Sequence, residues 1–245
     1  MKFLEQIRAI TLSVHKDPKK LFDEIVGYDD IKKAFFLFIN SQKKINILLN
    51  GPPGCSKTLF LLAMQHFKGA YFLDASNSSG AGIFDELIDE KGDPKFLLLD
   101  EIDGLKRSDQ KTLFNMFETG ILKSTKIRNK KETGHVTRSR ELKNLKVFAT
   151  CNDTSKLSNA LLSRFMVLTL KEYTEQEFLD IAAGLYPKKD PLLVEYVAKA
   201  TLHILKSKDI RDFQKIADQA DSAEEADMLI QLQVKYAKPK EEEEQ

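Results

Sequence analysis

The stretch Gly51–Pro52–Pro53–Gly54–Cys55–Ser56–Lys57–Thr58 decides the fold. It follows an apolar run at residues 45–50 and precedes an apolar segment of helical length, so it predicts a tight loop between a buried strand and a helix. Backbone amides in such a loop surround phosphate oxygens, helped by the helix N-terminus. Lys57 is then expected to reach the β- and γ-phosphates, and the Thr58 hydroxyl to ligate Mg²⁺. Ser56 stands where the usual pattern has glycine.

Apolar runs on both sides of this loop predict the rest of a sheet. The expected strands are residues 45–50, 71–76, 95–100, 145–152 and 165–170. They are almost continuously apolar and alternate with helical segments, which is typical of a parallel sheet covered on both faces. From Tyr173 onward the segments have helical spacing with no strand between them. The sequence therefore predicts an α/β fold: a five-stranded parallel P-loop sheet flanked by helices, followed by a small all-helical lid domain.

The same patterns divide the chain into four predicted segments. Residues 1–20 are expected to form an amphipathic N-terminal helix, which Pro18 helps to end. Residues 21–171 form the P-loop core and residues 172–238 the helical lid. Residues 239–245 form a charged, acidic tail.

Composition bounds the class of protein. The 245 residues are 31% charged, but the net charge is only +1, so overall charge neither favours nor excludes nucleic acid as a partner. The two cysteines, Cys55 and Cys151, lie far apart and are too few for a disulfide scaffold, which favours a reducing compartment. No signal peptide and no run of roughly 18 apolar residues occurs. These features predict a cytoplasmic protein with no membrane partner.

Two carboxylates follow the apolar run at residues 96–99. Asp100 and Glu101 stand at the predicted carboxyl end of a buried strand, where charged groups are costly unless they have a task. Beside a phosphate loop, Asp100 is expected to hold Mg²⁺, and Glu101 to orient and polarise an attacking water. Asn152 ends the next expected strand, and its amide is a candidate contact for the γ-phosphate or that water.

These motifs together resemble the AAA+ ATPase family over residues 20–235. GPPGCSKT is similar to the Walker A motif, LLLDE to Walker B, and Asn152 falls where sensor 1 belongs. The resemblance implies ATP and Mg²⁺ as cofactors, with Lys57, Glu101 and Asn152 as catalytic residues and Thr58 and Asp100 at the metal. The residues that it implies for nucleotide binding are Ile25, Val26, Gly27 and Tyr28 at the base, and Pro53, Gly54, Cys55, Ser56, Lys57, Thr58 and Leu59 at the phosphates.

Two arginines complete the resemblance. Arg164, in Leu161–Leu162–Ser163–Arg164–Phe165, looks like the arginine finger that reaches the nucleotide of a neighbouring subunit. Arg211, in Ser207–Lys208–Asp209–Ile210–Arg211, resembles sensor 2 of the helical lid. A finger that acts on a neighbour implies a head-to-tail homo-oligomer, and a closed ring of six subunits is the family's habit.

A basic segment lies between the Walker B and sensor 1 motifs. Residues 121–146 hold nine basic residues against two acidic ones, a net charge of +7. The turn at Lys130–Gly134 lies between flanks that can pair as a hairpin. Its placement resembles the pre-sensor-1 hairpin of RuvB-like, MCM-like and MoxR-like proteins. A positive hairpin would attract a phosphate backbone, so DNA is an expected partner. The predicted DNA-binding residues are Lys126, Arg128, Lys130, Lys131, Arg138 and Arg140.

The sequence leaves three functions open. The basic segment favours an ATP-driven DNA motor of the helicase or branch-migration type. A protein-remodelling chaperone of the MoxR kind is the alternative, although residues 77–82 lack the aromatic residue of a threading loop. A loader or switch ATPase is the third. A protein partner could supply DNA specificity in any of them.

Overall fold

The computed structural model describes residues 18–75, 87–88, 94–127, 135–142 and 144–236. The chain splits into two compact units. The first comprises Met1–Pro52 and Ser56–Leu170, and the second comprises Pro53–Cys55 and Lys171–Gln245. Residues 1–17 of the predicted N-terminal helix lie outside the described residues. Pro18, expected to end that helix, is instead the first residue of α2 (Pro18–Leu21), where a proline costs no hydrogen bond because the N–H groups of the first helical turn have no partner within the helix. The predicted acidic tail also lies outside the described residues.

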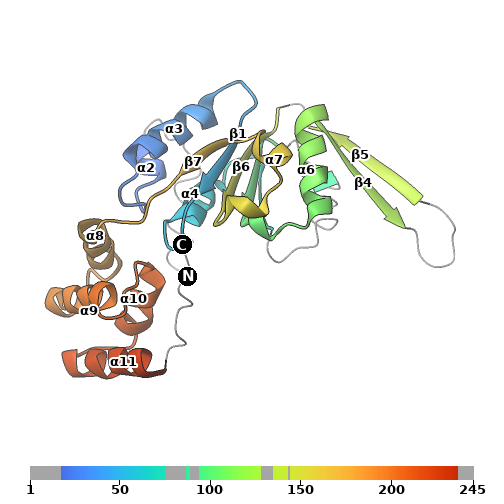
Figure 1. The fold of residues 1–245 in the computed structure, drawn as a ribbon. Helices are drawn as coiled ribbons and strands as arrows, with labels where there is room; N and C mark the ends of the chain where they lie inside the picture. Colours follow the sequence, from blue (N-terminus) through green and yellow to red (C-terminus); the bar gives the residue numbers. More distant parts are fainter. Residues whose placement is uncertain (1–17, 76–86, 89–93, 128–134, 143, 237–245) are drawn as a thin grey trace. The chain divides into compact units, whose positions relative to one another are not determined.

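A five-stranded parallel sheet forms the centre of the first unit, in the order β2-β3-β6-β1-β7. The strands are β1 (Asn46–Asn50), β2 (Ala70–Asp74), β3 (Phe96–Asp100), β6 (Lys146–Cys151) and β7 (Met166–Thr169). The predicted parallel sheet is confirmed. The strand that leads into the glycine-rich loop, β1, lies beside β6 (Figure 1). The strand that ends in the two carboxylates, β3, pairs with β6 on its other side.

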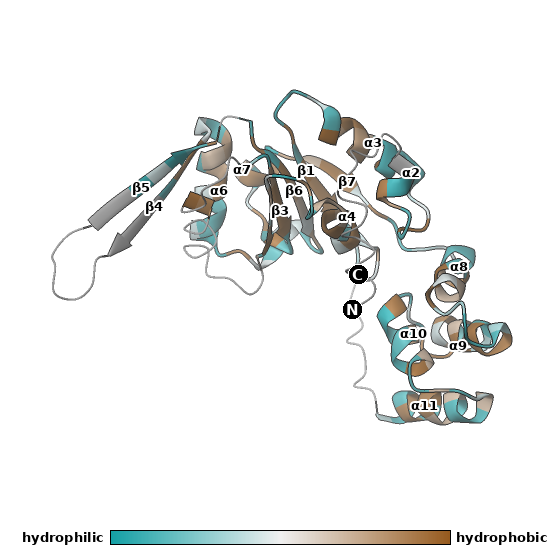
Figure 2. Cartoon of the chain, turned by 180° about the vertical axis from the view of Figure 1, so that it is seen from behind, coloured by the Kyte–Doolittle hydropathy of each residue, from teal (hydrophilic) through white to brown (hydrophobic). Residues whose placement is uncertain are grey.

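Alternate side chains of these strands pack against helices on opposite faces of the sheet. On one face, Val147 and Ala149 share a core with Leu113 of α6 (Arg107–Thr119) and Leu161 of α7 (Asn159–Leu162). On the other face, Phe148 stacks on an aromatic cluster that belongs to α3 (Asp29–Asn40) and α4 (Lys57–Met64). β1, β3 and β6 are accordingly brown in the hydropathy colouring of Figure 2. Burial of both faces explains why these strands are continuously apolar.

A second, two-stranded sheet follows α6 directly. The strand β4 (Ile121–Ile127) pairs antiparallel with β5 (His135–Glu141), from Ile121 opposite Glu141 to Ile127 opposite His135. Leu122 is fully buried at the base, where the pair joins the core of the unit. From this base the strands extend away from the five-stranded sheet (Figure 1). The expected turn at Lys130–Gly134 lies outside the described residues.

The second unit is helical. It contains α8 (Glu175–Leu185), α9 (Pro191–His203), α10 (Ile210–Ala217) and α11 (Ala223–Tyr236). Local signals set the helix starts: Thr174 and Glu177 form a capping box at α8, and Asp190 caps α9 ahead of its first-turn proline. A separate core, which includes Phe178 and Phe213, holds the helices together. The predicted helical region after the sheet is therefore confirmed.

Two short 3₁₀ turns, η1 (Ile102–Gly104) and η2 (Thr154–Lys156), follow the carboxyl ends of β3 and β6. They lie at the same edge of the sheet as the start of the glycine-rich loop, residues 51–56, which follows β1. Within the described parts of the chain, no helix is both long and apolar enough to cross a membrane.

Candidate active site

The glycine-rich loop leads from β1 into α4, whose first residue is Lys57. Its backbone turns through left-handed conformations, with φ of +83° at Gly54 and +58° at Ser56. A left-handed residue with a side chain costs roughly 1–2 kcal/mol. This explains why the usual pattern has glycine before the lysine, and it shows that Ser56 adopts the conformation that glycine would supply.

Lys57 is buried against its own loop. Its ammonium donates hydrogen bonds of 2.7 Å each to the carbonyl oxygens of Gly51 and Pro52. Burying an ammonium is costly, and the dipoles of these two carbonyl groups offset part of that cost. An arriving phosphate would compete with the carbonyls for the same ammonium.

A hydrogen-bonded network joins the ends of α4, β3 and β6. The Thr58 hydroxyl donates to Asp100, with Oγ1 2.9 Å from Oδ2. The Thr150 hydroxyl donates to Oδ1 of the same carboxylate at 2.5 Å and accepts the Glu101 N–H at 2.9 Å. Thr150 therefore fixes both acidic residues at once. Glu101 itself has a left-handed backbone, with φ of +54°, which turns the chain out of the strand and into η1.

The same network bears on a metal ion. Mg²⁺ prefers hard oxygen ligands, and the Thr58 hydroxyl and Asp100 carboxylate are two such groups already in contact. Asp103 of η1 adds a second carboxylate, whose Oδ1 is buried and has no hydrogen-bond partner among the described residues. This buried oxygen can therefore accept a hydrogen bond from a further donor, such as a water molecule coordinated to a metal ion. The residues present therefore fit Mg²⁺, which Thr58 and Asp100 would hold.

Asn152 comes directly after β6, and the register pairs Cys151 with Asn50 at the end of β1. Asn152 is thus exposed at the same edge as the start of the glycine-rich loop. The neighbouring Cys151 thiol donates to Asn50 Oδ1 at 3.4 Å. Burial, with a smaller effect of the Asp103 charge, raises the pKa of Cys151 to about 12. This thiol is therefore a neutral packing group near pH 7.

The segment predicted to contact the base, residues 25–28, lies beside α4. Ile25 is buried, and its carbonyl oxygen accepts from the Lys32 ammonium. Gly27 and Tyr28 have left-handed backbones, with φ of +69° and +54°. The Tyr28 ring lies 6.4 Å from the Phe60 ring of α4, and Val26 is half-buried. The structure therefore brings these residues beside the helix that begins at the glycine-rich loop, and Leu59 of that helix is half-buried.

Arg164 lies at the opposite edge of the sheet. It precedes β7, and its carbonyl oxygen accepts from Asn46 Nδ2 at 3.1 Å, at the amino end of β1. Five residues separate Asn46 from Gly51, which at the usual rise of a strand is about 16 Å. Its guanidinium instead pairs with Glu118 of α6, with Nε 2.6 Å from Oε1. Arg164 is thus not assembled with Lys57 and Asp100 within its own subunit.

The sequence of the core matches a known family. Residues 47–173, more than half of the chain, match the ATPase family associated with various cellular activities (AAA). The chain belongs to the AAA ATPase family. The match begins in β1 and ends after β7, so it includes the glycine-rich loop, Asp100, Asn152 and Arg164.

Individual relatives of this AAA ATPase are only distantly similar in sequence, at 20–29% identity for the three described below. Cell division protein C of Sulfolobus acidocaldarius is 29% identical, matched over 41% of this chain and 33% of the relative. Replication-associated recombination protein A of Coxiella burnetii is 27% identical, over 65% of this chain and 33% of the relative. The chain thus spans about a third of the length of these relatives. The RuvB Holliday junction branch migration motor of Thermotoga maritima has the same fold, with a TM-score of 0.60 at 20% identity, over 86% of this chain and 70% of that one.

The basic segment of this AAA ATPase is only partly described. Arg128, Lys130 and Lys131 lie outside the described residues, as does the side chain of Lys126. Arg138 and Arg140 are two positions apart on β5 and so lie on one face of the pair. Both are half-buried, and Arg140 Nη1 donates to the Leu87 carbonyl oxygen at 2.8 Å.

Lys146, the last basic residue of the segment 121–146, is buried and stabilises the fold. Its buried ammonium donates to the carbonyl oxygens of Phe38, Ile39 and Ser41 at the end of α3. Burial lowers its pKa. This lysine therefore terminates a helix and is not part of a surface that a partner could contact.

Arg211, the predicted sensor 2 residue, belongs to the second unit. It is exposed at the second position of α10, and its N–H donates to Asp209 Oδ1, which caps that helix. Pro53, Gly54 and Cys55 are assigned to the same unit, and Cys55 is buried.

Sequence reasoning missed Thr150 and Asp103. Thr150 is a polar residue inside the apolar run of β6, and that break in the pattern was its only signal. Asp103 follows the Asp100–Glu101 pair closely, so its sequence position alone could have nominated it.

Proposed function

We propose that this AAA ATPase is a cytoplasmic, ATP-hydrolysing motor that acts on DNA as a ring of identical subunits, six by the habit of its family. The observation that carries the DNA part is the antiparallel β4–β5 pair, which belongs to a segment with a net charge of +7. A helicase or branch-migration activity is the form of motor that we favour.

Hydrolysis divides among residues at the loop edge of the sheet. Lys57 exchanges the Gly51 and Pro52 carbonyls for the β- and γ-phosphates. Glu101 orients and polarises the attacking water, and Thr150 keeps its backbone in place. Asn152 contacts the γ-phosphate or that water. Arg211 of the second unit contacts the γ-phosphate and so links the position of the lid to the nucleotide state.

Mg²⁺, when bound, neutralises charge on the phosphate oxygens. Thr58 and Asp100 are the side chains that orient it, and their mutual hydrogen bond holds both in the required place beforehand. Residues 25–28 provide the surface for the base, because they pack beside α4 on the same side of the sheet.

Arg164 acts on the neighbouring subunit in this proposal. About 16 Å of strand separates it from its own glycine-rich loop, so it can meet a nucleotide only across an interface. A head-to-tail contact of this kind gives a ring when the rotation between neighbouring subunits closes. An arginine supplied in trans can be worth roughly 10³–10⁵ in rate, because it stabilises charge on the transferred phosphoryl group.

DNA would bind along the basic pair through its phosphates. The predicted contacts are Lys126, Arg128, Lys130, Lys131 and Arg138. Arg140 is a weaker candidate than the sequence suggested, because its guanidinium is engaged by Leu87. Phosphate contacts make affinity fall steeply with salt and do not read sequence, so a protein partner would supply specificity.

The deciding experiment compares ATP hydrolysis with and without single-stranded, duplex and branched DNA at low and high salt. The double reversal Lys130→Glu/Lys131→Glu should remove DNA binding, and with it the stimulation, while basal hydrolysis stays. The matched control reverses two exposed lysines away from the hairpin, Lys68 and Lys188, with the same change in net charge. DNA affinity that both double variants lower equally would contradict a specific role for the hairpin. Hydrolysis indifferent to every DNA would instead favour a polypeptide client.

A further inference from the structure

The contacts of the Arg164 side chain come from α6. Glu118 pairs with its Nε at 2.6 Å, and the guanidinium carbon lies 5.5 Å from the centre of the Phe114 ring, one turn earlier on the same helix. Both charged side chains remain more than 40% exposed. The ion pair therefore fixes the direction of the arginine without burying it, and α6 determines where the arginine points.

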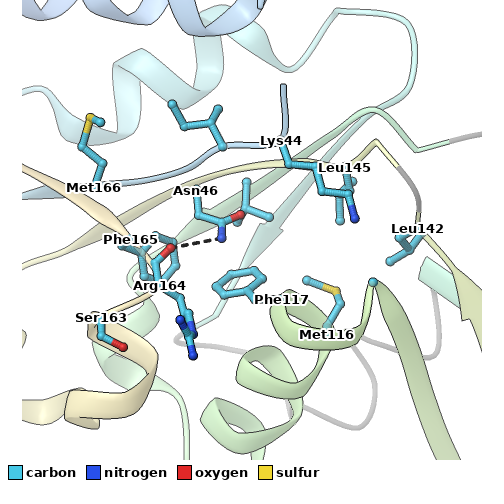
Figure 3. Close-up of a pocket in the computed structure, with 13 residues that line it drawn as sticks. Lys44, Asn46, Met116, Phe117, Leu142, Leu145, Ser163, Arg164, Phe165 and Met166 are labelled. Atoms are coloured by element: carbon cyan, nitrogen blue, oxygen red, sulfur yellow. Dashed lines mark hydrogen bonds between the residues drawn. The ribbon is translucent and has the colours of Figure 1, made fainter. Parts of the chain in front are cut away.

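Space beside the pair would let the arginine move. Arg164 lines a cavity of about 530 Å³ formed by the C-terminal part of α6 and the amino ends of β1, β6 and β7. Figure 3 shows Arg164 next to Phe117 of α6, and its backbone anchored through Asn46. Phe165 is held edge-on against Phe117, with ring centres 5.2 Å apart. The Arg164 N–H also donates to the Leu161 carbonyl oxygen at 3.0 Å, so the backbone is anchored on both sides of the residue while the long side chain has room to turn.

Glu118 also stands at the root of the basic hairpin. The helix ends at Thr119, and Gly120, with φ of +67°, turns the chain into β4. The Gly120 N–H donates to Met116 at 2.9 Å, and its carbonyl oxygen accepts the Leu142 N–H at 2.7 Å, which closes the base of the hairpin. Both hairpin strands are therefore tied to the last helical turn, which carries Glu118. A displacement of the hairpin strands would therefore move this last turn of α6 first.

We infer that Glu118 is a positioning residue that holds Arg164 in a resting orientation and links the hairpin to the ATPase site of the neighbouring subunit. Paired with Glu118, the guanidinium is partly neutralised and directed at its own chain. When a client engages the hairpin and shifts the end of α6, the arginine is released toward the neighbour. The inference rests on the proposed role of Arg164 in trans.

The size of the effect follows from the exposure of the pair. Half-exposed ion pairs hold their partners only weakly, and the usual range corresponds to about a 1.5- to 5-fold change in an equilibrium. Loss of the Glu118 charge should therefore raise basal kcat by about 1.5- to 5-fold. KM for ATP should stay unchanged, because Arg164 acts on the transition state and not on nucleotide binding.

Mixed oligomers test this directly. A Glu101→Gln subunit keeps its arginine but has no working site, and an Arg164→Ala subunit keeps its site but has no arginine, so a mixture reports only transfer in trans. Placing Glu118→Gln in the Glu101→Gln donor should raise kcat of the mixture by about 1.5- to 5-fold. The same substitution in the Arg164→Ala acceptor should change nothing, and this is the matched control. Asp109→Asn, which removes a charge near the start of the same helix, should also be silent in the donor.

The outcomes separate the two proposals. Suppose that the mixture is active, but that Glu118→Gln in the donor has no effect, lowers kcat, or has the same effect when it is placed in the acceptor. Each of these results overturns the role of Glu118 and remains consistent with an arginine that acts in trans. A mixture without any recovered hydrolysis overturns both. In the full chain, Glu118→Gln should also reduce the ratio of DNA-stimulated to basal hydrolysis. Unchanged stimulation beside a raised basal rate would keep the resting contact and overturn its link to the hairpin.

Discussion

Replacement of Thr150 by valine tests the network at the end of β3. Valine has nearly the same shape and suits a strand, so the change replaces the hydroxyl with a methyl group. Two interactions are lost: the 2.5 Å bond to Asp100 and the 2.9 Å bond from the Glu101 N–H. A bond to a charged acceptor contributes about 1.5–3 kcal/mol, and a buried donor left unpaired costs about 1–3 kcal/mol. Allowing for gained burial of a methyl group, the free energy of unfolding should fall by about 2–4 kcal/mol.

Urea denaturation followed by circular dichroism measures this, because the chain has no tryptophan. Thr201→Val is the matched control. Thr201 is as fully buried as Thr150, but among the described residues its hydroxyl donates to one group, the Val197 carbonyl oxygen of its own helix. Its replacement should cost less than about 1 kcal/mol. Thr150→Ser should restore most of the loss, because it keeps the hydroxyl. A Thr150→Val chain as stable as the Thr201→Val chain would refute the account of this network.

Three further predictions concern the core and the site. Glu101→Gln should bind ATP normally yet hydrolyse it on the order of 10²–10⁴-fold more slowly, which single-turnover assays beside equilibrium binding would show; weakened binding instead would give Glu101 a different role. Lys146→Met leaves the carbonyls at the end of α3 without their buried donor, so denaturation should show a loss of about 2–4 kcal/mol, whereas Lys43→Met on the exposed surface should change little. The pKa of Cys151 is raised from an ordinary 9.0 to about 12, so above pH 9 the unfolded chain loses a proton that the folded chain keeps. Stability should therefore fall as pH rises above 9, by up to about 1.4 kcal/mol per pH unit from this group, and Cys151→Ala should remove that share of the slope; equal slopes would contradict it.

Features encoded in short stretches of sequence could be predicted. The apolar runs at β1, β3 and β6 each identify a strand because both faces of the sheet are covered, and the loop after β1 has a pattern of its own. The family and the five-stranded sheet followed from these signals. The roles of the individual site residues remain predictions, since they depend on a nucleotide and a neighbouring subunit.

Contacts between distant segments could not be predicted. Thr150 meets Asp100 and Glu101 only because β6 lies beside β3, an order that no local pattern encodes. Lys146 counts as one more charge of the basic segment by sequence, yet the fold places it at the end of α3. Glu118 and Arg164 meet because α6 and α7 pack on the same face of the sheet. In each case the strand order and helix packing decide the partner.

The most direct test of the central claim is the hydrolysis of ATP by a mixture of Glu101→Gln and Arg164→Ala chains. Each variant alone should be nearly inactive. In an equal, randomly assembled mixture, about a quarter of the sites combine an intact Glu101 with a neighbour that carries Arg164, so about a quarter of wild-type activity should return. Activity of Arg164→Ala alone near the wild-type level, or a mixture no more active than its parts, would contradict an arginine that acts across a subunit interface.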